Sequence, residues 1–172
     1  MRRPSMSVAL VMALVLGLPG MAIADTPGPW DPGEPVSDGM TLRIRAVTLD
    51  AKVLVTVYGT VRCDPKPTID GQATTWAGLE LRAVVQQATS KGIAHGSSWS
   101  WRDPARVCDG LAHRIVFRIA ADPAGMPFKI GTAIVSVAGY ARWEGCDEAT
   151  QECVNGADEA ATGWVVTRLR PH

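Results

Sequence analysis

The fold is decided most clearly by residues 52–63, which read KVLVTVYGTVRC. Every second position from Val53 to Cys63 is apolar or small, and the positions between them are mixed. Successive side chains of a strand point to opposite faces, so this period of two predicts a β-strand with one buried face. No stretch beyond the N-terminal region shows a convincing period of 3.6 residues. The sequence therefore predicts an all-β protein.

The same alternation recurs along the chain between clusters of turn-forming residues. Residues 64–71 contain Pro65, Pro67 and the pair Asp70-Gly71, which predict a loop. About seven antiparallel strands, each with one apolar face, suggest two packed sheets. Beside 52–63, the expected strands are 42–49, 79–89, 111–121, 128–143 and 163–169, with a shorter edge strand at 97–102.

Residues 1–24 have the pattern of an export signal. Arg2 and Arg3 precede an apolar run at 8–18, and Ala22-Ile23-Ala24 supplies the small residues that a signal peptidase reads. The apolar run is too short to span a membrane. We expect a secreted, extracellular protein that begins at Asp25 and keeps no membrane anchor.

Residues 25–40 follow as a leader rich in proline and glycine, and four prolines lie between Asp25 and Gly39. Proline removes backbone donors, so this stretch predicts a disordered segment that is dispensable for folding. We expect the β-sandwich domain to span residues 41–170.

The charge balance narrows the classes of partner. The chain carries 17 basic and 17 acidic residues, and removal of the export signal leaves 15 basic against 17 acidic. A small negative net charge argues against a nucleic-acid partner held by counterion release and against docking on an anionic membrane. No cofactor motif is present, and we expect no nucleic acid, cofactor or metal to bind.

Four cysteines allow three pairings. Cys146 and Cys153 lie close enough in sequence to pair across a small loop, which leaves Cys63 to pair with Cys108. A zinc site would need two close ligand pairs, and the chain has one. Because an exported chain favours oxidation, we expect two disulfides.

Four segments of the chain form a recognisable series of strand and turn patterns: 55–63 (VTVYGTVRC), 85–87 (VQQ), 108–110 (CDG) and 128–133 (FKIGTA). Together they resemble a group of small secreted bacterial domains with an immunoglobulin-like sandwich and no assigned activity. The resemblance covers residues 41–170 and implies an immunoglobulin-like antiparallel β-sandwich of about seven strands. It implies a fold and no chemistry, and the pair Cys146 and Cys153 is an addition to the pattern.

His95 is the candidate centre of a hydrolytic site. It lies in a loop-like stretch near Ser97, Ser98 and Ser100, and either Asp103 or Asp109 could complete a serine–histidine–aspartate set. No Gly-x-Ser-x-Gly elbow accompanies these residues, which weakens this alternative. The other histidines are accounted for more simply, because His113 falls on the apolar face of a strand and His172 is terminal.

The acidic stretch 144–159 is a candidate calcium loop. Calcium needs converging carboxylate and carbonyl oxygens, and a disulfide between Cys146 and Cys153 could stiffen such a loop. The spacing matches no known calcium motif, so a solvated acidic loop is the simpler interpretation. Its acidic residues are Glu144, Asp147, Glu148, Glu152, Asp158 and Glu159.

Tryptophan and arginine gather between residues 95 and 106. Trp99 and Trp101 would share one face of a short strand, and Arg102 and Arg106 follow them. Both residue types dominate many binding surfaces. The competing interpretation is that the two rings cap the core. The sequence predicts a non-catalytic extracellular domain that binds a protein or glycan through this region, with a small secreted hydrolase centred on His95 as the alternative.

Overall fold

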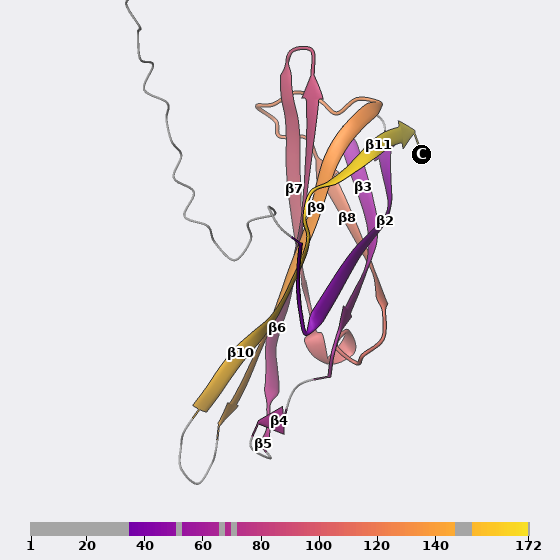
Figure 1. Cartoon of the computed structure of the whole chain (residues 1–172). Coiled ribbons are helices and arrows are strands. Elements are labelled where there is room, and N and C mark those ends of the chain that lie inside the picture. The colour runs from indigo at the N-terminus through magenta and orange to yellow at the C-terminus, as the bar shows by residue number, and fades with distance from the viewer. Residues whose placement is uncertain (1–34, 51–52, 66–67, 70–71, 147–152, 172) are drawn as a thin grey trace, which may run out of the picture.

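The computed structural model describes residues 35–50, 53–65, 68–69, 72–146 and 153–171. Within these residues the chain forms eleven strands and one short 3₁₀ helix, η1 (Pro104–Arg106), and no α-helix (Figure 1). The all-β prediction is confirmed. The predicted export signal at 1–24 and leader residues 25–34 lie outside the described residues. None of the described segments forms a helix long and apolar enough to cross a membrane.

Nine of the strands form one continuous sheet. Three of them make an antiparallel half, in the order β2 (Met40–Asp50), β3 (Leu54–Cys63) and β8 (His113–Ala120). The other half has the antiparallel order β7 (Gly92–Arg102), β6 (Thr75–Thr89), β9 (Gly131–Cys146), β10 (Cys153–Thr162) and β1 (Pro35–Asp38). A separate small hairpin joins β4 (Thr68–Ile69) to β5 (Gln72–Ala73).

The last strand, β11 (Val165–Pro171), connects the two halves. It pairs antiparallel with the start of β9 and parallel with the end of β2. Thr162 marks the change from β10 to β11, where its Oγ1 accepts a hydrogen bond of 3.0 Å from the Val137 amide. We expected two separate sheets, but β11 makes the sheet continuous, and the sheet curls into a nearly closed barrel (Figure 1).

The barrel closes where β7 approaches β8. The Asp122 amide, just after β8, donates a hydrogen bond of 2.9 Å to the His95 carbonyl of β7. A side chain at Gly96 would collide with the Ala120 carbonyl and would lie 2.9 Å from Cγ2 of Ile119. Glycine therefore permits the close contact of the two strands.

One apolar core fills the interior. The alternation predicted for residues 52–63 is confirmed within β3, where Val55, Val57 and Val61 are fully buried. Val53, expected on the same face, instead lies in the turn before β3 and is 58% exposed. The most deeply buried set also includes Leu79, Leu81 and Val85 of β6, Met40, Ile119, Phe128, Val135, Val137 and Leu169. Burial of each such side chain contributes about 1.5–3 kcal/mol relative to exposure, so this face holds the sheet closed.

The leader is shorter than the sequence suggested. We expected disorder up to residue 40, but residues 35–38 form β1, which pairs with β10, and Met40 is 1% exposed within the core. Pro35 begins an edge strand, a position where the missing backbone donor is tolerated. The prediction of disorder from proline content was therefore wrong for residues 35–38, which form the outermost strand of the sheet.

The acidic stretch is also different from expectation. Much of 144–159 was expected to be loop, yet β9 extends to Cys146 and β10 starts at Cys153. Residues with low strand propensity, such as Asn155 and Gly156, obscured β10 in the sequence. Pairing with β9 supplies the backbone hydrogen bonds that these residues would not secure alone. Residues 147–152 lie outside the described part of the chain.

Other strand boundaries shifted by smaller amounts. The edge strand expected at 97–102 begins at residue 92, and β8 begins at His113 rather than at Leu111, whose side chain is exposed. The predicted loop 64–71 contains β4.

Both predicted disulfides are confirmed. Cys63 pairs with Cys108, 45 residues apart, and Cys146 pairs with Cys153, which joins the ends of β9 and β10. No cysteine remains free. Two disulfides indicate an oxidising, extracellular environment.

Candidate functional site

Two tryptophan side chains lie exposed on the edge strand β7. Trp99 and Trp101 are two residues apart and therefore on the same face, and they are 64% and 51% exposed. Their alternation with Ser98 and Ser100 directs both rings away from the barrel interior. The interpretation that these rings cap the core is therefore wrong.

The strand register gives the rings polar and aromatic neighbours. Trp99 lies opposite Arg82 of β6, and Trp101 lies opposite Glu80. Glu80 in turn lies opposite Tyr140 of β9. Because adjacent strands are about 4.8 Å apart, a strip three strands wide presents aromatic residues at both margins and charged residues between them.

We call this strip the aromatic face. It consists of Glu80, Arg82, Trp99, Trp101, Tyr140 and Arg142.

Two contacts hold parts of the aromatic face in place. The Trp101 ring lies over Gly78 of β6, where an added Cβ would be 3.2 Å from Cζ3 of the ring. The guanidinium of Arg142 lies over the Tyr140 ring, 5.8 Å from its centroid. Backbone pairing on β6 and β9 further fixes the spacing of the strip, so the face is formed before any ligand arrives.

Arg102 and Arg106 do not belong to this face. Arg102 pairs with buried Leu79, so strand alternation directs it to the opposite face from the two tryptophans. Arg106 lies in η1 and forms an exposed ion pair of 3.5 Å with Asp103. The arginines that lie on the same face as the two tryptophans are instead Arg82 and Arg142. Strand alternation alone puts Glu80 and Arg82 on the face opposite buried Leu79 and Leu81, but only the register places them beside the rings.

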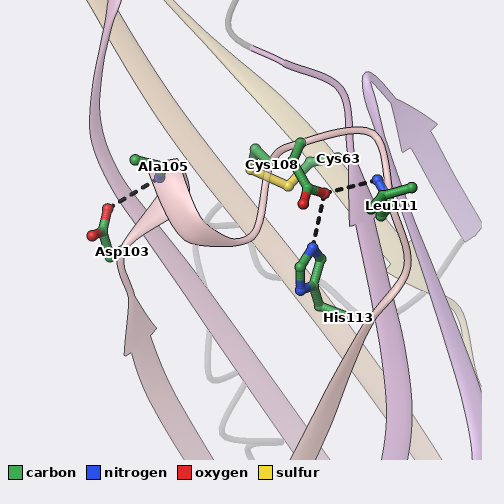
Figure 2. The surroundings of a disulfide bond; sticks show 7 residues. Cys63, Asp103, Ala105, Cys108, Leu111 and His113 are labelled. Carbon is green, nitrogen blue, oxygen red and sulfur yellow. Dashed lines mark hydrogen bonds and ion pairs between the residues drawn. A yellow bond between two sulfur atoms is a disulfide. The ribbon is translucent and has the colours of Figure 1, made fainter.

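The connection from η1 to β8 is stabilised by short-range contacts around the disulfide (Figure 2). Asp103 Oδ1 accepts a hydrogen bond of 3.0 Å from the Ala105 amide, and the Gly110 amide donates one of 3.0 Å to the Cys63 carbonyl. The Asp109 carboxylate accepts one of 2.8 Å from the Leu111 amide. These contacts make the segment a structural clamp at one end of the barrel.

His113 completes this clamp. Its Nε2 lies 2.8 Å from Oδ1 of Asp109. The hydrogen bond from His113, with that from the Leu111 amide, lowers the pKa of Asp109 from its ordinary value of 3.8. His113 is half-buried at the start of β8 and lies opposite buried Val61, on the apolar face of the strand that the sequence predicted.

His95 has an acidic neighbour but no serine partner. Its Nε2 lies 3.2 Å from Oδ2 of Asp122, and the two side chains are partly exposed, by 53% for His95 and 38% for Asp122. Within the described residues no serine hydroxyl is hydrogen-bonded to His95. The two carboxylates considered from the sequence are elsewhere, because Asp103 caps η1 and Asp109 contacts His113. A nucleophile and its base need direct contact, so this geometry does not favour the hydrolase alternative.

The described residues contain no group of three or more histidine, cysteine, aspartate or glutamate side chains that could hold a metal ion. Of the six carboxylates in the candidate calcium loop, Glu144 lies on β9, and Asp158 and Glu159 lie on β10. The other three fall within 147–152, outside the described residues.

No protein-family model matches the chain, and no curated protein matches it significantly. The fold and the exposed strip define the class of protein, a disulfide-bonded all-β domain with an aromatic face on one half of its sheet.

Proposed function

We propose that this protein is a secreted, non-catalytic extracellular domain that binds a glycan on the aromatic face. The observation that carries the proposal is the exposure of Trp99 and Trp101 side by side on a paired strand. The two large aromatic rings are exposed to water, and a ligand that covered their apolar surface would gain binding free energy.

We also propose that the barrel is a variant of the immunoglobulin-like sandwich. The strand order supports this assignment, since β2, β3 and β8 form one half while β7, β6, β9 and β10 form the other. A parallel pairing between β2 and β11 joins an early strand to the last one. Non-catalytic binding is a frequent use of such frameworks, although a fold alone does not define function.

The chemistry of the face suits a sugar chain. A pyranose ring presents a flat apolar side that stacks on an aromatic ring, and its hydroxyls need directed donors and acceptors. Trp99 and Trp101 offer two adjacent surfaces, and Glu80 and Arg82 lie directly opposite them to meet hydroxyl groups. Because these groups are on strands rather than flexible loops, little entropy is lost on binding.

A glycan is favoured over a protein partner by what surrounds the rings. The core of a protein–protein interface is depleted in glutamate, although arginine is enriched there, so Glu80 directly opposite Trp101 is the unfavourable group for a protein partner. Here Glu80, Arg82 and Arg142 lie between or beside the aromatic side chains. The proposed ligand therefore contacts apolar and charged groups together.

The test is binding of the Trp99→Ala/Trp101→Ala variant to immobilised neutral oligosaccharides of the cello-, manno-, xylo- and chito- series. We expect each ring to contribute about 2 kcal/mol, as hot-spot aromatics do, so the double variant should lose binding by 100-fold or more. Its free energy of unfolding should fall by about 1 kcal/mol or less, because the rings are exposed.

The matched control is Ile93→Ala/Val166→Ala, which removes two other exposed apolar side chains. This control should bind as the parent protein does. The proposal is contradicted if the parent binds none of the four series, or if the tryptophan variant binds equally well. A parent that instead captures a protein through Trp99 and Trp101 would replace the glycan with a protein partner.

A further inference from the structure

A second surface, on the other half of the sheet, is rich in arginine. It is the outer face of β2, β3 and β8, and we call it the arginine face. Its members are Arg43, Arg45, Arg62, Arg114 and Arg118, with Tyr58 among them. They are five of the eleven arginines that follow the predicted export signal. Basic charge is therefore concentrated on one face of a chain whose overall charge is balanced.

The register spreads these side chains evenly over three strands. Arg43 and Arg114 lie on either side of Thr60, and Arg118 lies opposite Thr56. Arg62 is two residues beyond Thr60, on the same face of β3. Arg45 is the extra residue at the β-bulge between Ile44 and Ala46, where the register with β3 shifts.

None of these five guanidinium groups is neutralised within the described residues. The ion pairs within 4.0 Å there involve Arg106 and the two histidines His95 and His113. Two acidic residues lie at the margins of the face. Asp50 accepts a hydrogen bond of 2.8 Å from the Thr56 hydroxyl, and Asp64, just after β3, is exposed. Like charges placed close together repel, so the face gains stability when an anion binds.

The face carries two shallow depressions that are open to solvent. One depression of about 240 Å³ is lined by Arg43, Arg45, Thr60 and Arg62 among others. A second, of about 860 Å³, is lined by Tyr58, Arg114 and Arg118 among others, with Asp50 at its far end. Thr60 and Tyr58 are two residues apart on β3, so the depressions are neighbours along the strand. Together they form an elongated basic seat.

We propose that the arginine face binds a linear polysaccharide whose sugar units carry carboxylates. The planar guanidinium fork matches a carboxylate with two parallel hydrogen bonds, which a lysine ammonium does not. Repeated carboxylates along a chain match repeated guanidinium groups along the seat. This site is separate from the aromatic face and does not rest on the function proposed for it.

The side chains of the arginine face favour a polysaccharide over nucleic acid or protein. Single-stranded nucleic acid relies on stacking of bases on exposed aromatic rings. The aromatic ring here, Tyr58, is covered by the Arg114 guanidinium at 5.4 Å from its centroid. The core of a protein interface is depleted in most charged residues, whereas here Tyr58 and Val116 lie between Arg114 and Arg118, and an apolar centre of useful size is missing from this face.

The experiment measures affinity of the mature protein for polygalacturonate, a carboxylated polysaccharide, over a range of salt concentrations. We expect binding that weakens as salt rises, because counterions are released. Fully methyl-esterified polygalacturonate, which keeps the sugar backbone but lacks the charge, should not bind at this face.

The decisive variants are Arg62→Gln/Arg114→Gln and a control of equal charge, Arg102→Gln/Arg106→Gln. The first should weaken polygalacturonate binding about 30-fold and reduce the salt slope by about two, as expected when two ionic contacts are lost. The control should keep the parent affinity within about twofold, since Arg102 and Arg106 lie outside the arginine face.

Three results would overturn the proposal. The first is no binding of polygalacturonate at low salt. The second is an equal loss of affinity in both double variants, which would mean that net charge alone matters. The third is tighter binding of a single-stranded oligonucleotide than of polygalacturonate, which would assign the face to nucleic acid. Thermal unfolding of each variant confirms that any loss is not a loss of fold.

Discussion

Removing each disulfide in turn tests how the two crosslinks share the stability of the barrel. The variants are Cys63→Ala/Cys108→Ala and Cys146→Ser/Cys153→Ser, each of which removes one crosslink and leaves no free thiol. Cys63 and Cys108 are buried and close a segment of 45 residues, whereas Cys146 and Cys153 are exposed and close a segment of 7 residues.

The expected losses follow from chain entropy in the unfolded state. A crosslink that closes 45 residues stabilises by about 4 kcal/mol, and one that closes 7 residues by about 2.4 kcal/mol. Loss of buried sulfur atoms from Cys63 and Cys108 adds about 1 kcal/mol to the first value. Replacing the first disulfide should therefore cost about twice as much as replacing the second.

Urea unfolding of the oxidised protein measures the difference. With a denaturant slope of about 2 kcal/mol/M, the midpoint should fall by about 2.5 M for the first variant and about 1.2 M for the second. Equal losses, or a larger loss for the Cys146/Cys153 variant, would show that the loop entropies and the burial of Cys63 do not govern stability.

The remaining predictions concern the N-terminal strand and the clamp beside the disulfide. Deleting residues 25–39 removes β1 from β10 and the Gly39 carbonyl that accepts a hydrogen bond of 3.1 Å from the Asp64 amide. This deletion should cost about 2 kcal/mol, seen as a fall of about 6 °C in Tm by calorimetry, whereas an unchanged Tm would restore the view of a dispensable leader. Asp109→Asn should reduce Tm near pH 6, because the lowered pKa of Asp109 means that its carboxylate stabilises the fold above the ordinary value of 3.8. That stabilisation is lost as pH falls through the lower folded-state pKa, so the Tm values of parent and variant should converge near pH 2. A gap that stays constant with pH would contradict this assignment.

The interior of the barrel was predictable because strand alternation has a physical cause that is local. The alternation within residues 52–63 can be seen in that segment alone, and it predicts the burial of Val55, Val57 and Val61. The disulfides were also predictable, since spacing left few arrangements. β1 and β10 were not, because neither segment has the composition of a strand and each depends on a neighbour distant in sequence.

The candidate site could be predicted only in part. Exposure of Trp99 and Trp101 follows from their spacing on an edge strand, but the identity of their neighbours depends on register. Glu80 and Tyr140 reach the aromatic face through pairings of β6 with β7 and β9. The arginine face could not be predicted for a related reason. Net charge describes the whole chain, whereas the pairing of β2, β3 and β8 gathers five arginines on one face.

The most direct test of glycan binding at the aromatic face is an NMR titration that follows the indole N–H signals of a protein comprising residues 25–172. The titrant is the neutral oligosaccharide that binds best among the four series. The account predicts that the Trp99 and Trp101 signals shift with saturation, while those of the less exposed Trp76 and Trp143 stay in place. Saturable binding that leaves the Trp99 and Trp101 signals unmoved would contradict it.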